Sequence, residues 1–155
     1  NMVYEYRGVA YLYEECYLKC RLPSGRILYY PRPHLRLAKM PWADRNGEAV
    51  ERQQLYYWGL NETRQWVPKK LYRSVLLENV VQALARDLLG GHWLQLKDHG
   101  YPGHMVMLVH DELVAEVPET YNGNMMAEVM SKPPAWCPDL PLEVAGWRGK
   151  RYRKD

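Results

Sequence analysis

The chain has 155 residues, of which 47% are hydrophobic and 25% are charged, and its formal net charge is +3 at pH 7. This size fits one domain and this balance is typical of a folded chain, which excludes a disordered protein and most complete multi-domain machines. The sequence contains no long apolar run, so we predict neither a membrane span nor a signal peptide, and we expect a cytoplasmic protein without a membrane partner.

The cysteines exclude two kinds of site, and the basic residues are concentrated at the C-terminal end. Cys16, Cys20 and Cys137 are too few and too scattered for a disulfide framework, and they lack the spacing of a zinc site. Residues 148–155 hold five basic side chains against Asp155, a net charge of +4. A basic tail can bind phosphates or can simply be a solvated terminus, and the sequence leaves both interpretations open.

The first half of the chain predicts a mixture of elements. Apolar residues at helical spacing favour a helix within residues 3–20, and Asn1, which precedes Met2, is left out of the prediction. Residues 22–30 combine a Pro-Ser-Gly turn with a β-rich run, which predicts a turn followed by a strand. Prolines, a glycine and charges predict a loop over residues 31–50. Two β-rich runs on either side of Asn61 and Glu62 predict a hairpin.

The strongest helical pattern covers residues 71–99. Its apolar residues recur at i+3 and i+4 spacing and predict one broad apolar face: Leu77, Val80, Val81, Leu84, Ala85, Leu88, Leu89 and Leu96. We expect Gly90 and Gly91 to weaken or kink this helix by about 1 kcal/mol each relative to alanine.

Hairpin and loop signals dominate the rest. Residues 104–109 are apolar on both faces, which is typical of a central strand covered on each side. Residues 113–117 alternate and predict a half-exposed return strand. We further expect a helix over 119–130 and a short strand over 142–144. The fold class is therefore α+β, with an antiparallel sheet and the hairpin packed on a long helix, in a single domain over residues 2–155.

His110, Asp111 and Glu112 lie between the two runs of that hairpin. A tight turn holds a carboxylate at the edge of a sheet, and Mg²⁺ commonly takes one or two protein carboxylates together with phosphates and water. Two such ions can activate an attacking hydroxyl and stabilise a leaving phosphate. The alternative is that Asp111 and Glu112 merely keep a turn soluble, and the residues alone do not decide between the two.

Four stretches resemble family A DNA polymerases, the DNA polymerase I type, particularly phage members, and they follow one another along the chain in the same order as in that family. Residues 109–118 resemble motif C, and residues 78–89 resemble the palm helix that precedes it. Residues 22–30 are similar to the strand beyond the fingers, and residues 141–147 to the C-terminal strand and tail. The resemblance covers roughly residues 20–150 and implies a palm-type sheet and a role in DNA replication.

The resemblance assigns roles to six residues. It implies that Asp111 is one of two metal-binding aspartates, that Glu112 tunes the metal site, and that His110 lies near the primer terminus. It also implies that Gln82 contacts the minor groove of the primer-template, that Asn79 helps there, and that Arg73 touches a phosphate. Without the resemblance, Gln82 on an apolar helix is as well explained as an amide at the edge of a core.

The family's remaining machinery is missing from residues 1–155. Motif A, with the second aspartate, and the fingers helix that holds the incoming dNTP are both absent. We therefore expect a C-terminal palm portion, inactive alone, in which the two-metal Mg²⁺ site is incomplete. Its expected partners are primer-template DNA and either a second polymerase chain or further copies of itself, because the palm sheet would leave apolar surface exposed. A degenerate DNA-binding remnant of a prophage polymerase is the alternative.

Overall fold

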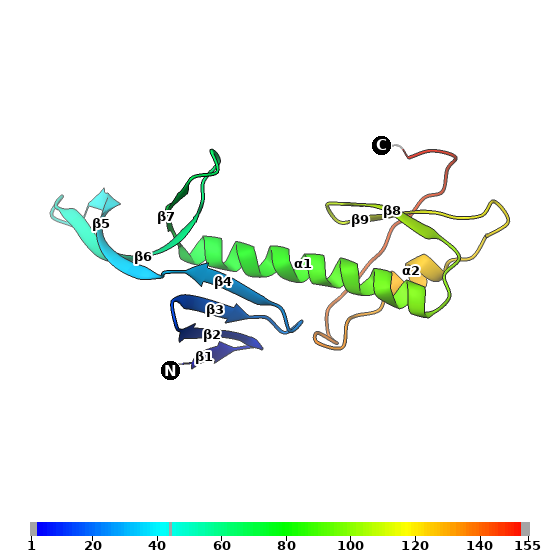
Figure 1. Cartoon of the computed structure of the whole chain (residues 1–155), viewed down its shortest axis with the longest axis horizontal. Helices are drawn as coiled ribbons and strands as arrows, with labels where there is room; N and C mark the ends of the chain where they lie inside the picture. The colour runs from blue at the N-terminus through cyan, green and yellow to red at the C-terminus, as the bar shows by residue number, and fades with distance from the viewer. Residues whose placement is uncertain (1–2, 44, 153–155) are drawn as a thin grey trace. The chain divides into compact units, whose positions relative to one another are not determined.

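The computed structural model describes residues 3–43 and 45–152, and these form the mixed α+β fold that the sequence predicts. The chain divides into two compact units, a first unit of Asn1–Gln82 and a second unit of Ala83–Asp155. Over the described residues, the strands form three antiparallel sheets (Figure 1).

The first sheet occupies the region where a helix was predicted, and that prediction is wrong. Its four strands are β1 (Val3–Tyr6), β2 (Val9–Glu14), β3 (Tyr17–Arg21) and β4 (Ile27–Pro31), and they pair in chain order. Two-residue loops join the first three strands, and positive φ angles at Arg7 (48°) and Gly8 (77°) suit such a tight hairpin. The turn residues and the β propensity of tyrosine and valine outweigh the weak helical spacing.

The second sheet runs through the segment predicted as a loop. It consists of β5 (His34–Ala43), β6 (Ala49–Leu60) and β7 (Trp66–Lys70), so only the hairpin around Asn61 was predicted correctly. The β5–β6 register shifts between Lys39 and Ala43, where Pro41 cannot donate a ladder hydrogen bond. An irregularity therefore accommodates the proline that had suggested a loop.

The long helix α1 (Arg73–Asp98) confirms the prediction and continues through Gly90 and Gly91 (Figure 1). Its apolar face is only partly covered. Val80 and Leu96 are buried, at 8% and 0% exposure, whereas Leu77 is 65% exposed. The periodicity located the helix correctly, but it did not show which apolar residues meet a core.

Each unit has its own small core. Among the described residues of the first unit, the buried ones are Ala10, Cys20, Leu22, Tyr30, Leu71 and Val80. In the second unit Leu96 and Val129 are buried together with His92, whose Nε2 lies 2.9 Å from the carbonyl oxygen of Lys132. This bond gives the buried imidazole a polar partner, which a buried polar group requires.

The second unit contains the predicted hairpin, formed by β8 (His104–Val109) and β9 (Glu112–Glu116). These two strands make a sheet by themselves, and Val106 is 58% exposed, so the expectation of a central strand covered on both faces is wrong. The helix expected over 119–130 shortens to α2 (Met125–Met130), and residues 142–144 form no strand. Turn-forming Asn-Gly-Asn before α2 explains its late start.

Candidate active site

A two-residue loop places Asp111 at the tip of the β8–β9 hairpin. Val109 pairs with Glu112, which leaves His110 and Asp111 to make the turn. His110 has a φ of 53°, in the left-handed region that non-glycine residues seldom adopt. Both loop residues are exposed, and among the described residues no hydrogen bond or ion pair of Asp111 is found. The carboxylate is thus held on a tight turn and is open to a ligand.

Glu112, by contrast, already has a partner. Its Oε2 accepts a hydrogen bond of 2.8 Å from the Tyr152 hydroxyl. This hydrogen bond to the carboxylate, with a smaller effect of burial, raises the pKa of Tyr152 above its ordinary value. The hydroxyl therefore stays protonated and donating at neutral pH, and Asp111 is the less engaged of the two acids.

The described part of the C-terminal tail folds back within the second unit. Arg148 donates hydrogen bonds to the carbonyl oxygens of Tyr121, Pro118 (3.3 Å) and Glu119 (3.0 Å). The guanidinium of Arg148 is thus used to fix the chain after β9, although the sequence left this tail open to phosphates. Arg153, Lys154 and Asp155, which belong to the predicted basic tail, lie outside the described residues.

Aromatic packing lies next to the base of the hairpin. The rings of Tyr101 and Tyr121 meet edge to face with centroids 5.7 Å apart, and the Tyr101 hydroxyl contacts the Met126 sulfur at 3.7 Å. A Cβ on Gly103 would lie 2.4 Å from the Tyr101 ring, so a larger residue immediately before β8 would displace this ring. Burial raises the pKa of Tyr101, which keeps its hydroxyl neutral.

The carboxylate of Asp111 at the hairpin tip is suited to be one ligand of a magnesium site. Carboxylate oxygens are the ligands that Mg²⁺ prefers, and it commonly takes only one or two from protein. Within residues 3–43 and 45–152, no three His, Cys, Asp or Glu side chains come together as a metal site. Asp111 could therefore supply one protein ligand, and the described chain offers no cluster to complete the coordination.

The three candidates on α1 differ in what they contact. Asn79 is half-buried, and its Nδ2 donates a 3.1 Å hydrogen bond to the Tyr30 hydroxyl, so this amide joins the helix to the first sheet. Gln82 lies three residues later, hence on the same side of the helix, and is exposed. Arg73, also exposed, is the first residue of α1 and lines a groove with β1 and β2.

Sequence reasoning missed the partner of Glu112 and the groove. Tyr152 lies forty residues beyond Glu112, and no local spacing signals such a contact. The groove depends on β1 and β2, which had been predicted as helix. Arg7-Gly8, a tight-hairpin signal, was the available clue to that sheet.

Comparison with known proteins gives one informative likeness. A DNA polymerase of Bacillus phage SP02 is 37% identical to this chain over 149 residues. The chain is similar to a phage DNA polymerase. The aligned region is 96% of this chain but 21% of the polymerase, so the chain spans about a fifth of that relative's length. No known family model matches the chain, and no solved structure matches it. No helix in the described part has the length and hydropathy of a membrane span.

Proposed function

We propose that this chain is the C-terminal palm portion of a family A DNA-directed DNA polymerase and contributes Asp111 to nucleotidyl transfer. The observation that carries the proposal is the 37% identity to a phage DNA polymerase over nearly the whole chain. The exposed carboxylate on a two-residue loop supports it, because the motif C resemblance implies a metal ligand at this residue.

Asp111 is the proposed protein ligand for Mg²⁺, with Glu112 as its acidic neighbour. When bound, the ions would neutralise charge on the phosphates and favour attack by the primer hydroxyl. The Tyr152 hydrogen bond restrains the Glu112 carboxylate, and the tight turn fixes the direction of Asp111. Exposed His110 and Gln82 are the proposed contacts to the primer-template, where minor-groove contact tolerates any sequence.

Asn79 and Arg73 have weaker support as primer-template contacts. The Asn79 amide already binds Tyr30, so we assign it a role in positioning α1 and leave Gln82 as the amide facing DNA. Arg73 is exposed and can reach a phosphate.

The remaining polymerase parts would come from other polypeptide. Motif A with its aspartate and the fingers that bind the dNTP are absent from residues 1–155. A second polymerase chain is the proposed source of these parts, and another copy of this chain is the alternative partner, which would cover apolar surface without supplying them. Exposed apolar side chains such as Leu35 (58%), Leu37 (71%) and Leu94 (62%) offer surface for such an association.

A chimeric polymerase that contains this chain tests the proposal. This chain replaces the matching 149-residue segment of the phage SP02 polymerase, and primer extension is measured with Mg²⁺. We expect the chimera to extend a primer and Asp111→Asn to lower the rate at least about 1,000-fold, since a metal ligand stabilises the transition state by several kcal/mol. Glu116→Gln is the matched control, because Glu116 is an exposed acid at the other end of the same hairpin.

Two outcomes would contradict the proposal. One is an Asp111→Asn chimera as active as the Glu116→Gln chimera. The other is robust primer extension by the isolated chain, which would mean that a second metal-binding carboxylate lies within these 155 residues.

A degenerate DNA-binding remnant is the second candidate, because the net charge of +3 and the exposed Arg73 and Gln82 suit contact with DNA that involves no metal. It predicts salt-dependent DNA binding by the isolated chain that needs no metal. Under this alternative, Asp111→Asn leaves DNA affinity unchanged and the grafted chimera is inactive, so one set of variants separates the two functions.

A further inference from the structure

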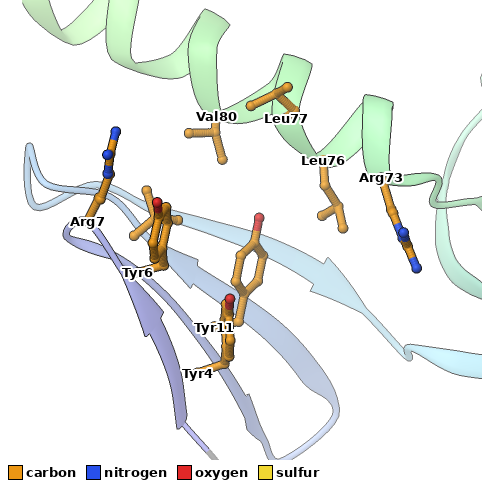
Figure 2. Close-up of a pocket in the computed structure, with 9 residues that line it drawn as sticks. Tyr4, Tyr6, Arg7, Tyr11, Arg73, Leu76, Leu77 and Val80 are labelled. Atoms are coloured by element: carbon orange, nitrogen blue, oxygen red, sulfur yellow. The ribbon is translucent and has the colours of Figure 1, made fainter.

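A groove in the first unit combines aromatic rings with arginines. Figure 2 shows the tyrosines of β1 and β2 on one side and apolar side chains of α1 on the other. The groove has a volume of about 370 Å³, within the range of ligand pockets. The residues that line it are Tyr4, Tyr6, Arg7, Val9, Tyr11, Arg73, Leu76, Leu77 and Val80.

Strand register explains the aromatic wall. Tyr4 pairs with Tyr11 and Tyr6 pairs with Val9, and directly paired residues project from the same face of a sheet. Tyr4 and Tyr6 are 66% and 61% exposed, so their rings are accessible from solvent. Tyr11 is half-buried deeper in the sheet, and its burial, with a hydrogen bond to Cys20, raises its pKa. The wall thus has a fixed inner ring and two open outer rings.

The charge of the groove is entirely positive. Arg7 and Arg73 lie at opposite ends of it (Figure 2), and none of the lining residues is acidic. The Arg7 guanidinium lies 5.4 Å from the centre of the Tyr6 ring, a cation–π contact that leaves its charge uncompensated. The nearby Glu5 carboxylate is paired with Arg21 instead, at 3.6 Å. An anionic ligand with flat apolar parts matches this arrangement.

We propose that this groove binds single-stranded nucleic acid, with bases stacked on Tyr4 and Tyr6 and phosphates at Arg7 and Arg73. Stacking on aromatic side chains beside basic groups is the general way in which single strands are bound without sequence preference. A purely apolar polypeptide segment would leave both guanidiniums without an anion. The site belongs to a different unit from Asp111 and requires no metal. It shares Arg73 with the proposed primer-template contacts, and it goes beyond them by adding the stacking rings Tyr4 and Tyr6 and the charge of Arg7.

Fluorescence anisotropy of a labelled fifteen-nucleotide oligothymidylate, added to the full chain with a chelator present, tests the inference. We expect Tyr6→Leu to weaken binding at least about fivefold, because removing one stacking ring has that effect on single-strand affinity. We expect Arg7→Gln to reduce the dependence of log affinity on log salt by about 0.7, the value for one phosphate contact on a single strand.

Matched variants control for loss of fold and of charge. Tyr29→Leu removes a tyrosine of the same sheet that is 52% exposed and outside the groove. Arg52→Gln removes an exposed arginine of β6. Both should bind the oligonucleotide as the unmodified chain does. Thermal melts should show all four variants folded, with Tyr29→Leu less stable by about 1 kcal/mol because it loses the edge-to-face contact of Tyr29 with Tyr17.

Three results would overturn the inference. They are no binding of the oligonucleotide by the unmodified chain at low salt, equal affinity of the groove and control variants, or conversion of a dimer to a monomer by Tyr6→Leu with affinity unchanged. The last result would make the groove a contact between copies. None of these results depends on Asp111. Failure of the groove proposal would therefore leave the proposed catalytic role of Asp111 untouched, and loss of that role would leave the groove proposal untouched.

Discussion

The inner part of the first sheet and the tip of the β8–β9 hairpin differ in how their polar side chains are used. In the inner part of the first sheet polar groups bond to one another: Asn79 binds Tyr30, and Tyr11 binds Cys20. At the hairpin tip His110 and Asp111 are exposed, and the described residues supply no partner to either carboxylate oxygen of Asp111. A polar group that is hydrogen-bonded within the fold contributes to stability. An exposed polar group without such a bond, held on a tight turn, is available to bind a ligand.

The largest expected effect lies in the core of the second unit. Leu96 is 0% exposed, and Leu96→Ala should lower the free energy of unfolding by about 2–5 kcal/mol through lost burial and a cavity. Leu94→Ala, two residues away but 62% exposed, should change it by no more than about 0.5 kcal/mol. Urea denaturation measures both, and equal effects would show that this face of α1 has no core.

Substitution of Asn79 should affect the stability of the fold, whereas substitution of Gln82 should affect DNA binding. Asn79→Ala removes the 3.1 Å hydrogen bond to Tyr30 and should cost about 0.5–1.5 kcal/mol of unfolding free energy. Gln82→Ala should leave stability nearly unchanged and weaken binding to a primer-template duplex. Thermal denaturation and anisotropy measure the two effects, and weaker DNA binding by Asn79→Ala alone would reverse the assignment.

Relief of strain at the hairpin tip should stabilise the chain slightly. Glycine tolerates the φ of 53° found at His110, so His110→Gly should raise the free energy of unfolding by up to about 1 kcal/mol. In the chimera the same variant should slow primer extension, because the proposed primer contact is lost. A destabilised variant in denaturation experiments would mean that the imidazole has a structural role.

The smallest expected effect is a change in the pKa of Tyr152, in the C-terminal tail. The Glu112 hydrogen bond raises the pKa of Tyr152, so the bond holds below the ordinary tyrosine pKa and is lost as the pH rises through the raised value. NMR ring-carbon shifts of Tyr152 should titrate at higher pH in the unmodified chain than in Glu112→Gln. Identical titrations would show that the tail does not contact the hairpin.

The sequence predicted local features better than long-range ones. Strict helical periodicity predicted α1, and turn residues predicted the β6–β7 and β8–β9 hairpins. The first sheet was missed because a weak helical spacing in residues 3–20 competed with tight turns such as Arg7-Gly8. The contacts of Glu112 with Tyr152 and of Asn79 with Tyr30 join residues 40 and 49 positions apart, which no local pattern specifies.

Metal specificity in the chimera tests most directly whether Asp111 binds a catalytic cation. With cysteine in place of this aspartate, the ligand becomes a soft thiolate, which binds Mg²⁺ poorly and softer divalent ions well. We predict that the Asp111→Cys chimera fails to extend a primer with Mg²⁺ and regains extension with Mn²⁺ or Cd²⁺, while Glu116→Cys keeps its Mg²⁺ activity. Full Mg²⁺ activity of the Asp111→Cys chimera would contradict the assignment of this carboxylate as a metal ligand.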